Sequence, residues 1–201
     1  MDLEMAKKRD HKILITEEAI RKVPRVRYQD IPESEYDNIQ ELAKTVLKIS
    51  KESNHSNEVA LTYSLDSVRL IENGKKYIGI ALGSEHEVDP LSSTTAYHLV
   101  HASYDCVVIV LHNHPSLSKF SLPDIKLLLK YETIKMMVVV TNLGSISYLV
   151  KKEKYQFHQA VDLYNEAVTR NNKASGLKGL QEAAEYFMKN CYRVGIVYED
   201  K

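Results

Sequence analysis

The sequence lacks an excess of charge of either sign. Its 201 residues include 27 lysines and arginines and 27 aspartates and glutamates, so the formal net charge at pH 7 is zero. Proteins that bind nucleic acid or anionic membranes through long-range electrostatics carry a basic excess. The balanced charge therefore argues against a general DNA-binding protein, and we expect no membrane as the partner.

Cysteine and long apolar stretches are also scarce. The two cysteines, Cys106 and Cys191, lack the paired spacing of a cysteine metal site, so we expect buried thiols in a reducing compartment. The charged opening segment leads into no apolar run, and no stretch reaches the roughly 20 apolar residues that span a bilayer. These absences predict a soluble, cytoplasmic protein, and the length fits one catalytic domain with extensions.

What the sequence does contain is a His-Asn-His-Pro motif directly after an apolar run. Residues 106–111, Cys-Val-Val-Ile-Val-Leu, predict a buried strand, and His112 and His114 follow it. Because alternate residues of a strand face the same side, we expect the two imidazoles to lie together and Asn113 to point away. The motif thus predicts two nitrogen ligands at a strand end.

A helix start follows the histidines. Ser121 and Asp124 have the spacing of an N-cap and its third helical residue, and Pro123 fits the first turn, where its missing N–H is harmless. Taken singly, these patterns are explained by a capping box and a solvated turn. Together, two imidazoles and a carboxylate make the three-ligand set of a catalytic zinc site. We therefore predict that His112, His114 and Asp124 bind Zn²⁺.

These motifs resemble those of the JAB/MPN+ (JAMM) metallopeptidase family. His-Asn-His-Pro followed by Ser-x-x-Asp resembles the family's metal-binding motif, and the form His-Asn-His-Pro-Ser is most similar to the RadC-like branch. Residues 58–66 resemble the strand that carries the family's catalytic glutamate, and residues 136–148 resemble the last strand pair. The resemblance therefore covers a catalytic domain of residues 58–150.

The resemblance implies a fold and a chemistry. The fold is α/β, with the mixed, cytidine-deaminase-like β-sheet of JAB/MPN domains flanked by helices. The activity is hydrolysis of a peptide or isopeptide bond by a metal-activated water, with Glu58 as general base and Ser121 as hydrogen-bond donor to the oxyanion. The substrate is a protein or peptide, and conjugates of a ubiquitin-like modifier belong to this class.

Residues outside the resemblance predict additional helices. Apolar residues recur at three- and four-residue steps over 34–53, which indicates a packing helix within an N-terminal extension of residues 1–57. Residues 151–201 form a C-terminal extension with helices over 151–171 and 180–190. We expect these helices to cover the sheet, and binding of a partner or a second copy is the alternative.

Two strand assignments are less direct. Residues 75–82 predict the hairpin partner of strand 58–65, joined to it through a turn at Asn73-Gly74. Residues 194–198 fit either a frayed end or an added edge strand.

Other histidines carry no metal assignment. Residues 85–87, Glu-His-Glu, are interpreted as exposed charge in a loop. His98 and His101 share one helix face but lack a third ligand, so we interpret them as surface or core-edge residues.

Two further functions stay open beside the peptidase. The motif is consistent with a RadC-like protein that acts in DNA repair or replication, whereas the neutral net charge argues against this role. A non-catalytic scaffold is the other alternative, because six residues separate His114 from Ser121 where the family usually has seven.

Overall fold

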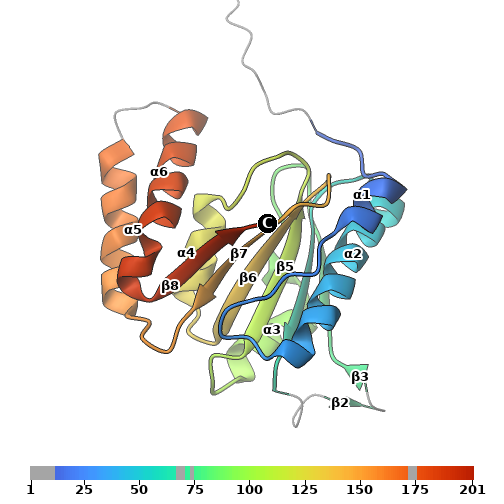
Figure 1. Ribbon diagram of the computed structural model, residues 1–201, viewed down its shortest axis with the longest axis horizontal. Helices are drawn as coiled ribbons and strands as arrows, with labels where there is room; N and C mark the ends of the chain where they lie inside the picture. Colours follow the sequence, from blue (N-terminus) through green and yellow to red (C-terminus); the bar gives the residue numbers. More distant parts are fainter. Residues whose placement is uncertain (1–11, 67–70, 73–74, 172–175) are drawn as a thin grey trace, which may run out of the picture.

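The computed structural model describes residues 12–66, 71–72, 75–171 and 176–201 (Figure 1). Within these ranges the helices are α1 (Glu17–Lys22), α2 (Tyr36–Ser53), α3 (Thr94–Ala102), α4 (Leu122–Lys130), α5 (Phe157–Asn171) and α6 (Leu177–Asn190). The strands are β1 (Val59–Ser64), β2 (Ile71–Glu72), β3 (Lys75–Lys76), β4 (Gly79–Leu82), β5 (Val108–His114), β6 (Ile134–Thr141), β7 (Ile146–Lys151) and β8 (Ile196–Asp200).

Six of these strands form one mixed sheet in the order β4-β1-β5-β6-β7-β8. β5 and β6 run parallel, and the other neighbouring pairs in this sheet are antiparallel. Parallel neighbours need a crossover connection, which α4 supplies between β5 and β6. The prediction of a mixed β-sheet flanked by helices is confirmed.

Helices cover both faces of the sheet. On one face, α1 and α2 pack against alternate residues of the central strands, such as Leu61 and Leu111. On the other face, α3, α4, α5 and α6 pack against residues such as Val110. Figure 1 shows α2 on one side of the twisted sheet and α4, α5 and α6 on the other. The result is a three-layer arrangement with an apolar cluster on each side.

β5 is the strand that positions the predicted ligands. All of its residues are buried, because β1 and β6 flank it and helices cover both its faces. Ile109 and Leu111 face the α2 side, whereas Val108 and Val110 face the α3 and α4 side. This alternation carries the histidines onto the face that α4 covers.

The predicted helices are observed with shifted ends. The helix predicted over 34–53 is α2, which follows a short 3₁₀ turn at Glu33–Glu35. The C-terminal helices are α5 and α6, of which α5 begins six residues later than predicted. Their apolar residues, including Ala160 and Phe187, join the cluster over the sheet, as expected. No helix in the described ranges combines the length and apolarity needed to cross a bilayer.

Residues 75–82 do not form the single strand that the sequence predicts. β3 pairs with β2 in a separate two-stranded sheet, and β4 alone pairs with β1; Asn73 and Gly74 lie outside the described residues. A Cβ at Gly79 would lie 2.5 Å from the backbone nitrogen of Ala96, so the chain touches α3 where β4 begins. β4 thus begins at Gly79, which pairs with Thr62 of β1 and packs closely on α3.

The C-terminal strand settles an alternative that the sequence left open. An added edge strand is observed, because β8 pairs antiparallel with β7 at the edge of the sheet. It begins two residues later than the predicted range, since Val194 ends a 3₁₀ turn over Cys191–Val194. The last residue, Lys201, also exchanges both backbone hydrogen bonds with Ile146.

Candidate metal centre

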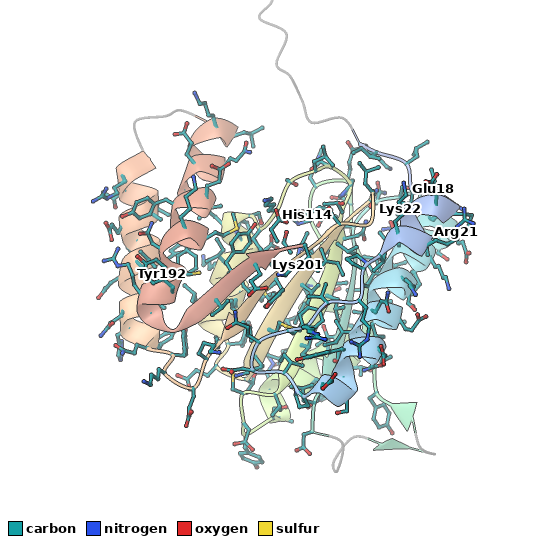
Figure 2. The ribbon with its side chains drawn as sticks, in the orientation of Figure 1. Glu18, Arg21, Lys22, His114, Tyr192 and Lys201 are labelled. Carbon is teal, nitrogen blue, oxygen red and sulfur yellow. The ribbon has the colours of Figure 1, made fainter. Side chains whose placement is uncertain are left out.

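β5 and α4 bring the three predicted ligands together. His112 and His114 end β5 on one face, and Asp124 lies in the first turn of α4. The two Nε2 atoms are 3.0 Å apart; His112 Nε2 lies 3.2 Å from Asp124 Oδ1, and His114 Nε2 lies 3.6 Å from Asp124 Oδ2. Figure 2 shows His114 at the upper end of the sheet, toward the end where α1 lies. Across the described residues, this is the one group of three such side chains close enough to hold a metal ion.

The spacing of these atoms fits a tetrahedral metal ion. Zinc bonds of about 2.0–2.1 Å to nitrogen and oxygen place neighbouring ligands of a tetrahedron about 3.3–3.4 Å apart. The 3.0 Å between the two Nε2 atoms and the 3.2 Å between His112 Nε2 and Asp124 Oδ1 lie close to this value, while the 3.6 Å from His114 Nε2 is measured to the other carboxylate oxygen, Oδ2. Two imidazoles and a carboxylate suit zinc and other divalent transition metals alike. The residues therefore fit a metal ion, and the one-residue-shorter loop does not keep Asp124 away from the histidines.

The loop after β5 orients His114. Its Nδ1 lies 3.0 Å from the carbonyl oxygen of Ser118, which can only accept a hydrogen bond. Nδ1 therefore carries a proton, and Nε2, which faces Asp124, has a lone pair for a metal when the ring is neutral. Ser116 and Ser118 stabilise this loop through a hydroxyl contact of 2.6 Å. Nδ1 of His112 is buried and has no partner among the described residues.

The capping box of α4 orients Asp124. Ser121 caps the helix, with the Asp124 N–H donating to Ser121 Oγ at 3.3 Å. In return, Asp124 Oδ2 accepts from the Ser121 N–H at 2.7 Å and from its hydroxyl at 2.6 Å. Oδ2 is thus held by Ser121, which leaves Oδ1 for a metal. The single hydroxyl proton of Ser121 is directed at Asp124 and not outward to a substrate.

Charge is shared unevenly among the three ligands. Burial is the largest influence on His114 and disfavours its charged form, but the hydrogen bond to Asp124, the charges of Asp124 and Glu58 and the Ser118 carbonyl together outweigh burial and raise its pKa to about 9. Burial would raise the pKa of Asp124, yet the charge of His112 and the hydrogen bonds from both rings hold it well below the usual range. Without a metal, the cluster therefore keeps an ionised carboxylate beside a protonated imidazole at neutral pH.

Glu58 lies beside this cluster, one residue before β1. Its N–H donates to the Ser84 carbonyl at 2.9 Å, and its own carbonyl accepts from the Gly83 N–H at 2.8 Å. The residue is only 7 % exposed, and this burial raises the pKa of its carboxyl, while the charges of His114 and His112 partly offset the rise. A raised pKa strengthens a carboxylate as a base, as general-base catalysis near neutral pH requires.

A pocket of about 140 Å³ opens beside Glu58. Its walls come from four separate segments and consist of Lys12, Glu58, Glu85, His86, Pro115, Ser116 and Ser118. Glu85 and His86 are exposed, as the sequence predicts, but they lie on the rim of this pocket. Lys12 Nζ donates to Asn57 Oδ1 at 2.6 Å, which attaches the N-terminal segment to the residue before Glu58.

Several of these residues carry no sequence signal. Lys12 is separated from the pocket's other walls by more than 40 residues, and Ser116 and Ser118 look like ordinary loop serines. The two histidines of α3, His98 and His101, lie outside the cluster. His98 is exposed, and the His101 ring stacks on Tyr97 while its Nδ1 contacts the Tyr97 carbonyl at 2.9 Å.

Comparison with known proteins adds no further constraint on this centre. No family model, curated protein or solved structure matches the chain.

Proposed function

We propose that the protein is a zinc-dependent metallopeptidase or isopeptidase of the JAB/MPN+ (JAMM) type, with a JAB/MPN catalytic domain over residues 58–150. One observation supports this most: His112, His114 and Asp124 converge within 4.8 Å, and the buried carboxyl of Glu58 lies beside them. A metal site with three protein ligands and a neighbouring base has the composition of a hydrolase centre.

In the proposed reaction, the metal and the protein side chains have different roles. Zinc held by His112, His114 and Asp124 would supply a Lewis acid for the scissile carbonyl and for water. Glu58 accepts the proton from the attacking water and later delivers it to the leaving amine, for which its raised pKa suits it. Ser121 holds Asp124 in place and, after rotation of its hydroxyl, donates to the oxyanion.

The substrate we propose is a protein or peptide, and conjugates of a ubiquitin-like modifier are one form of it. The resemblance of the His-Asn-His-Pro and Ser-x-x-Asp motifs supports this substrate class. Cys191 is buried as predicted, whereas the prediction of a buried Cys106 is wrong, because this residue precedes β5 and is exposed. A cytoplasmic location fits both free thiols, since the exposed one would be prone to oxidation elsewhere.

Metal content and cleavage test this function together. Protein purified without chelator should contain one zinc per chain by elemental mass spectrometry, and it should cleave members of a diverse peptide mixture. Glu58→Gln is the matched control, because it keeps the size of the side chain and removes the base. This variant should hold zinc and lose about a hundred- to ten-thousand-fold in rate.

The outcomes separate the alternatives. Wild-type protein that binds no zinc at neutral pH contradicts the enzyme. Zinc without cleavage of any peptide or conjugate favours the non-catalytic scaffold. Salt-dependent binding to DNA favours a RadC-like role with DNA, against which the balanced charge argues.

A further inference from the structure

The amide of Asn113, between the two histidines, belongs to a buried polar network on the opposite face of the sheet. Asn113 and Asn142 are both 0 % exposed, and Asn113 Nδ2 donates to Asn142 Oδ1 at 2.8 Å. Buried amides are costly unless their hydrogen bonds are made, so the geometry of such a pair is strongly constrained.

Asn113 contacts the residues on either side of Glu58. Its Oδ1 accepts from the Val59 N–H at 2.8 Å, and its Nδ2 donates to the Asn57 carbonyl at 3.1 Å. Backbone pairing between β1 and β5 extends only from Ala60 toward the C-terminus of β1. The Asn113 side chain therefore continues this pairing one residue further, to the point where Glu58 leaves the strand.

Asn142 connects the same point to two other segments. Its Nδ2 donates to the Ile13 carbonyl at 2.7 Å and to the Ser56 carbonyl at 3.0 Å, and its backbone N–H donates to the His114 carbonyl at 3.0 Å. Ile13 in turn donates to the Pro115 carbonyl at 2.7 Å. The N-terminal segment, the ligand strand and the approach to Glu58 thus meet at one pair of amides.

We infer that Asn113 is a positioning residue, which sets the place of Glu58 relative to the metal ligands. His112 and His114 leave β5 toward the metal, and the side chain between them holds the backbone before and after Glu58. The metal ligands and the backbone around Glu58 are therefore both positioned by residues 112–114 of β5. The inference rests on the proposed function, in which Glu58 is the base.

Hydrogen exchange of the Val59 amide tests the inference on metal-free protein. Asn113→Ala removes the acceptor, so exchange at Val59 should accelerate about tenfold relative to Val110 in the core of β5, the effect of roughly one hydrogen bond. Asn113→Ser, a milder change whose hydroxyl is too short to reach Val59, should act in the same direction. An unchanged ratio of the two exchange rates in either variant overturns the inference.

Ser50→Ala is the matched control within the network. Ser50 is buried, accepts from Asn113 Nδ2 at 3.2 Å and donates to the Asn57 carbonyl at 2.5 Å. Its removal lowers stability in the same cluster but leaves the bond to Val59 intact. The exchange ratio should therefore stay at the wild-type value, and acceleration equal to that of Asn113→Ala would show a general structural effect, which overturns a specific role.

A second readout reports the geometry directly. In cobalt-loaded protein, pseudocontact shifts of the Glu58 and Val59 amide signals depend on their position relative to the metal. Asn113→Ala should change these shifts and leave that of Ile125 in α4 unchanged, with cobalt affinity within about twofold of wild type. Unchanged shifts at Glu58 and Val59 contradict positioning. Failure of wild-type protein to bind cobalt or zinc contradicts the proposed function instead.

Discussion

The Nε2 atoms of His112 and His114 lie 3.0 Å apart and face the carboxylate of Asp124 together. Ser118 accepts the proton on Nδ1 of His114, so Nε2 of that neutral ring has only a lone pair to offer. When the ring is neutral, this lone pair and the ionised Asp124 carboxylate repel each other, and a cation between them stabilises both. A proton fills this role in the metal-free protein, and a metal ion competes with it for the same atoms.

Removing one ligand should abolish metal binding. His112→Ala and Asp124→Ala each leave two ligands, so we expect stoichiometric zinc in the wild type and less than about a tenth of it in either variant. Elemental mass spectrometry of protein at equal concentration measures this. His98→Ala is the control, because His98 is exposed and outside the cluster. Full zinc content in Asp124→Ala would show that another residue supplies the third ligand.

Zinc binding should release about one proton at neutral pH. The raised pKa of His114, about 9, means that this ring is protonated before the metal arrives. Zinc affinity should therefore rise up to about tenfold for each pH unit between 6.5 and 9. Calorimetry in buffers of different ionisation enthalpy measures the proton count. Affinity that is independent of pH over this range contradicts the prediction.

The stability of the metal-free protein should show the matching dependence. A histidine whose folded pKa exceeds its unfolded value of about 6.5 stabilises the fold most below pH 6.5. That contribution is lost as the pH rises toward 9. Denaturant unfolding of chelator-treated protein should therefore show a falling free energy of unfolding from pH 6.5 to 8, and His114→Gln should remove most of the fall.

Lengthening the loop after β5 should not improve the site. Asp124 already approaches both histidines, and the Ser118 carbonyl accepts from His114 across this loop. One residue inserted between Leu117 and Phe120 should leave activity unchanged or lower it, together with zinc affinity. Titration of zinc against the wild type and the insertion variant decides this. Higher activity after insertion would mean that the native loop holds the site out of register.

Lys151 should limit stability at neutral pH. It is 1 % exposed, donates to the Tyr131 carbonyl at 2.7 Å, and burial lowers its pKa to about 8. A lowered lysine pKa means that the unfolded chain binds the proton more tightly. Its contribution to the free energy of unfolding is therefore least favourable below pH 8 and increases from about pH 8 to 10.5.

Replacement of this lysine by methionine tests whether the buried charge lowers the free energy of unfolding at neutral pH. The Tyr131 carbonyl keeps its hydrogen bond from the Ile134 N–H at 3.2 Å, so Lys151→Met leaves no orphaned acceptor. We expect a gain of about 1–3 kcal/mol at pH 7 by urea denaturation, shrinking above pH 8. The exposed Lys154→Met is the control and should change stability by less than about 0.5 kcal/mol. A loss of stability in Lys151→Met would show that the buried hydrogen bond outweighs the buried charge.

The part of the site that the sequence predicts well depends on short-range geometry. Strand alternation determines that His112 and His114 share a face, and the capping box determines where Asp124 lies in its helix. Glu58 has no comparable pattern, because a glutamate at a strand start is common, and only the family resemblance singled it out. Its burial and raised pKa come from packing that no local pattern encodes.

Long-range contacts explain the features that the sequence did not predict. The placement of Lys12 on the pocket rim and of Asn142 beside Asn113 requires segments far apart in the chain to meet. At the division of residues 75–82, Gly79 lies against Ala96 of α3, which is a contact between separate segments of the chain. β8 forms because β7 offers an unpaired edge, which the sequence of residues 194–198 cannot reveal.

The three predicted metal ligands all lie within residues 112–124, whereas Glu58 and Ile13 join the centre from much earlier in the chain. Closing a short loop costs less conformational entropy than closing a long one. During folding, we therefore expect the β5–α4 unit to acquire metal affinity before the base is in place. Cobalt added during refolding should give its ligand-field spectrum before Val59 becomes protected from exchange. The opposite order would show that the metal site is assembled only by the complete fold.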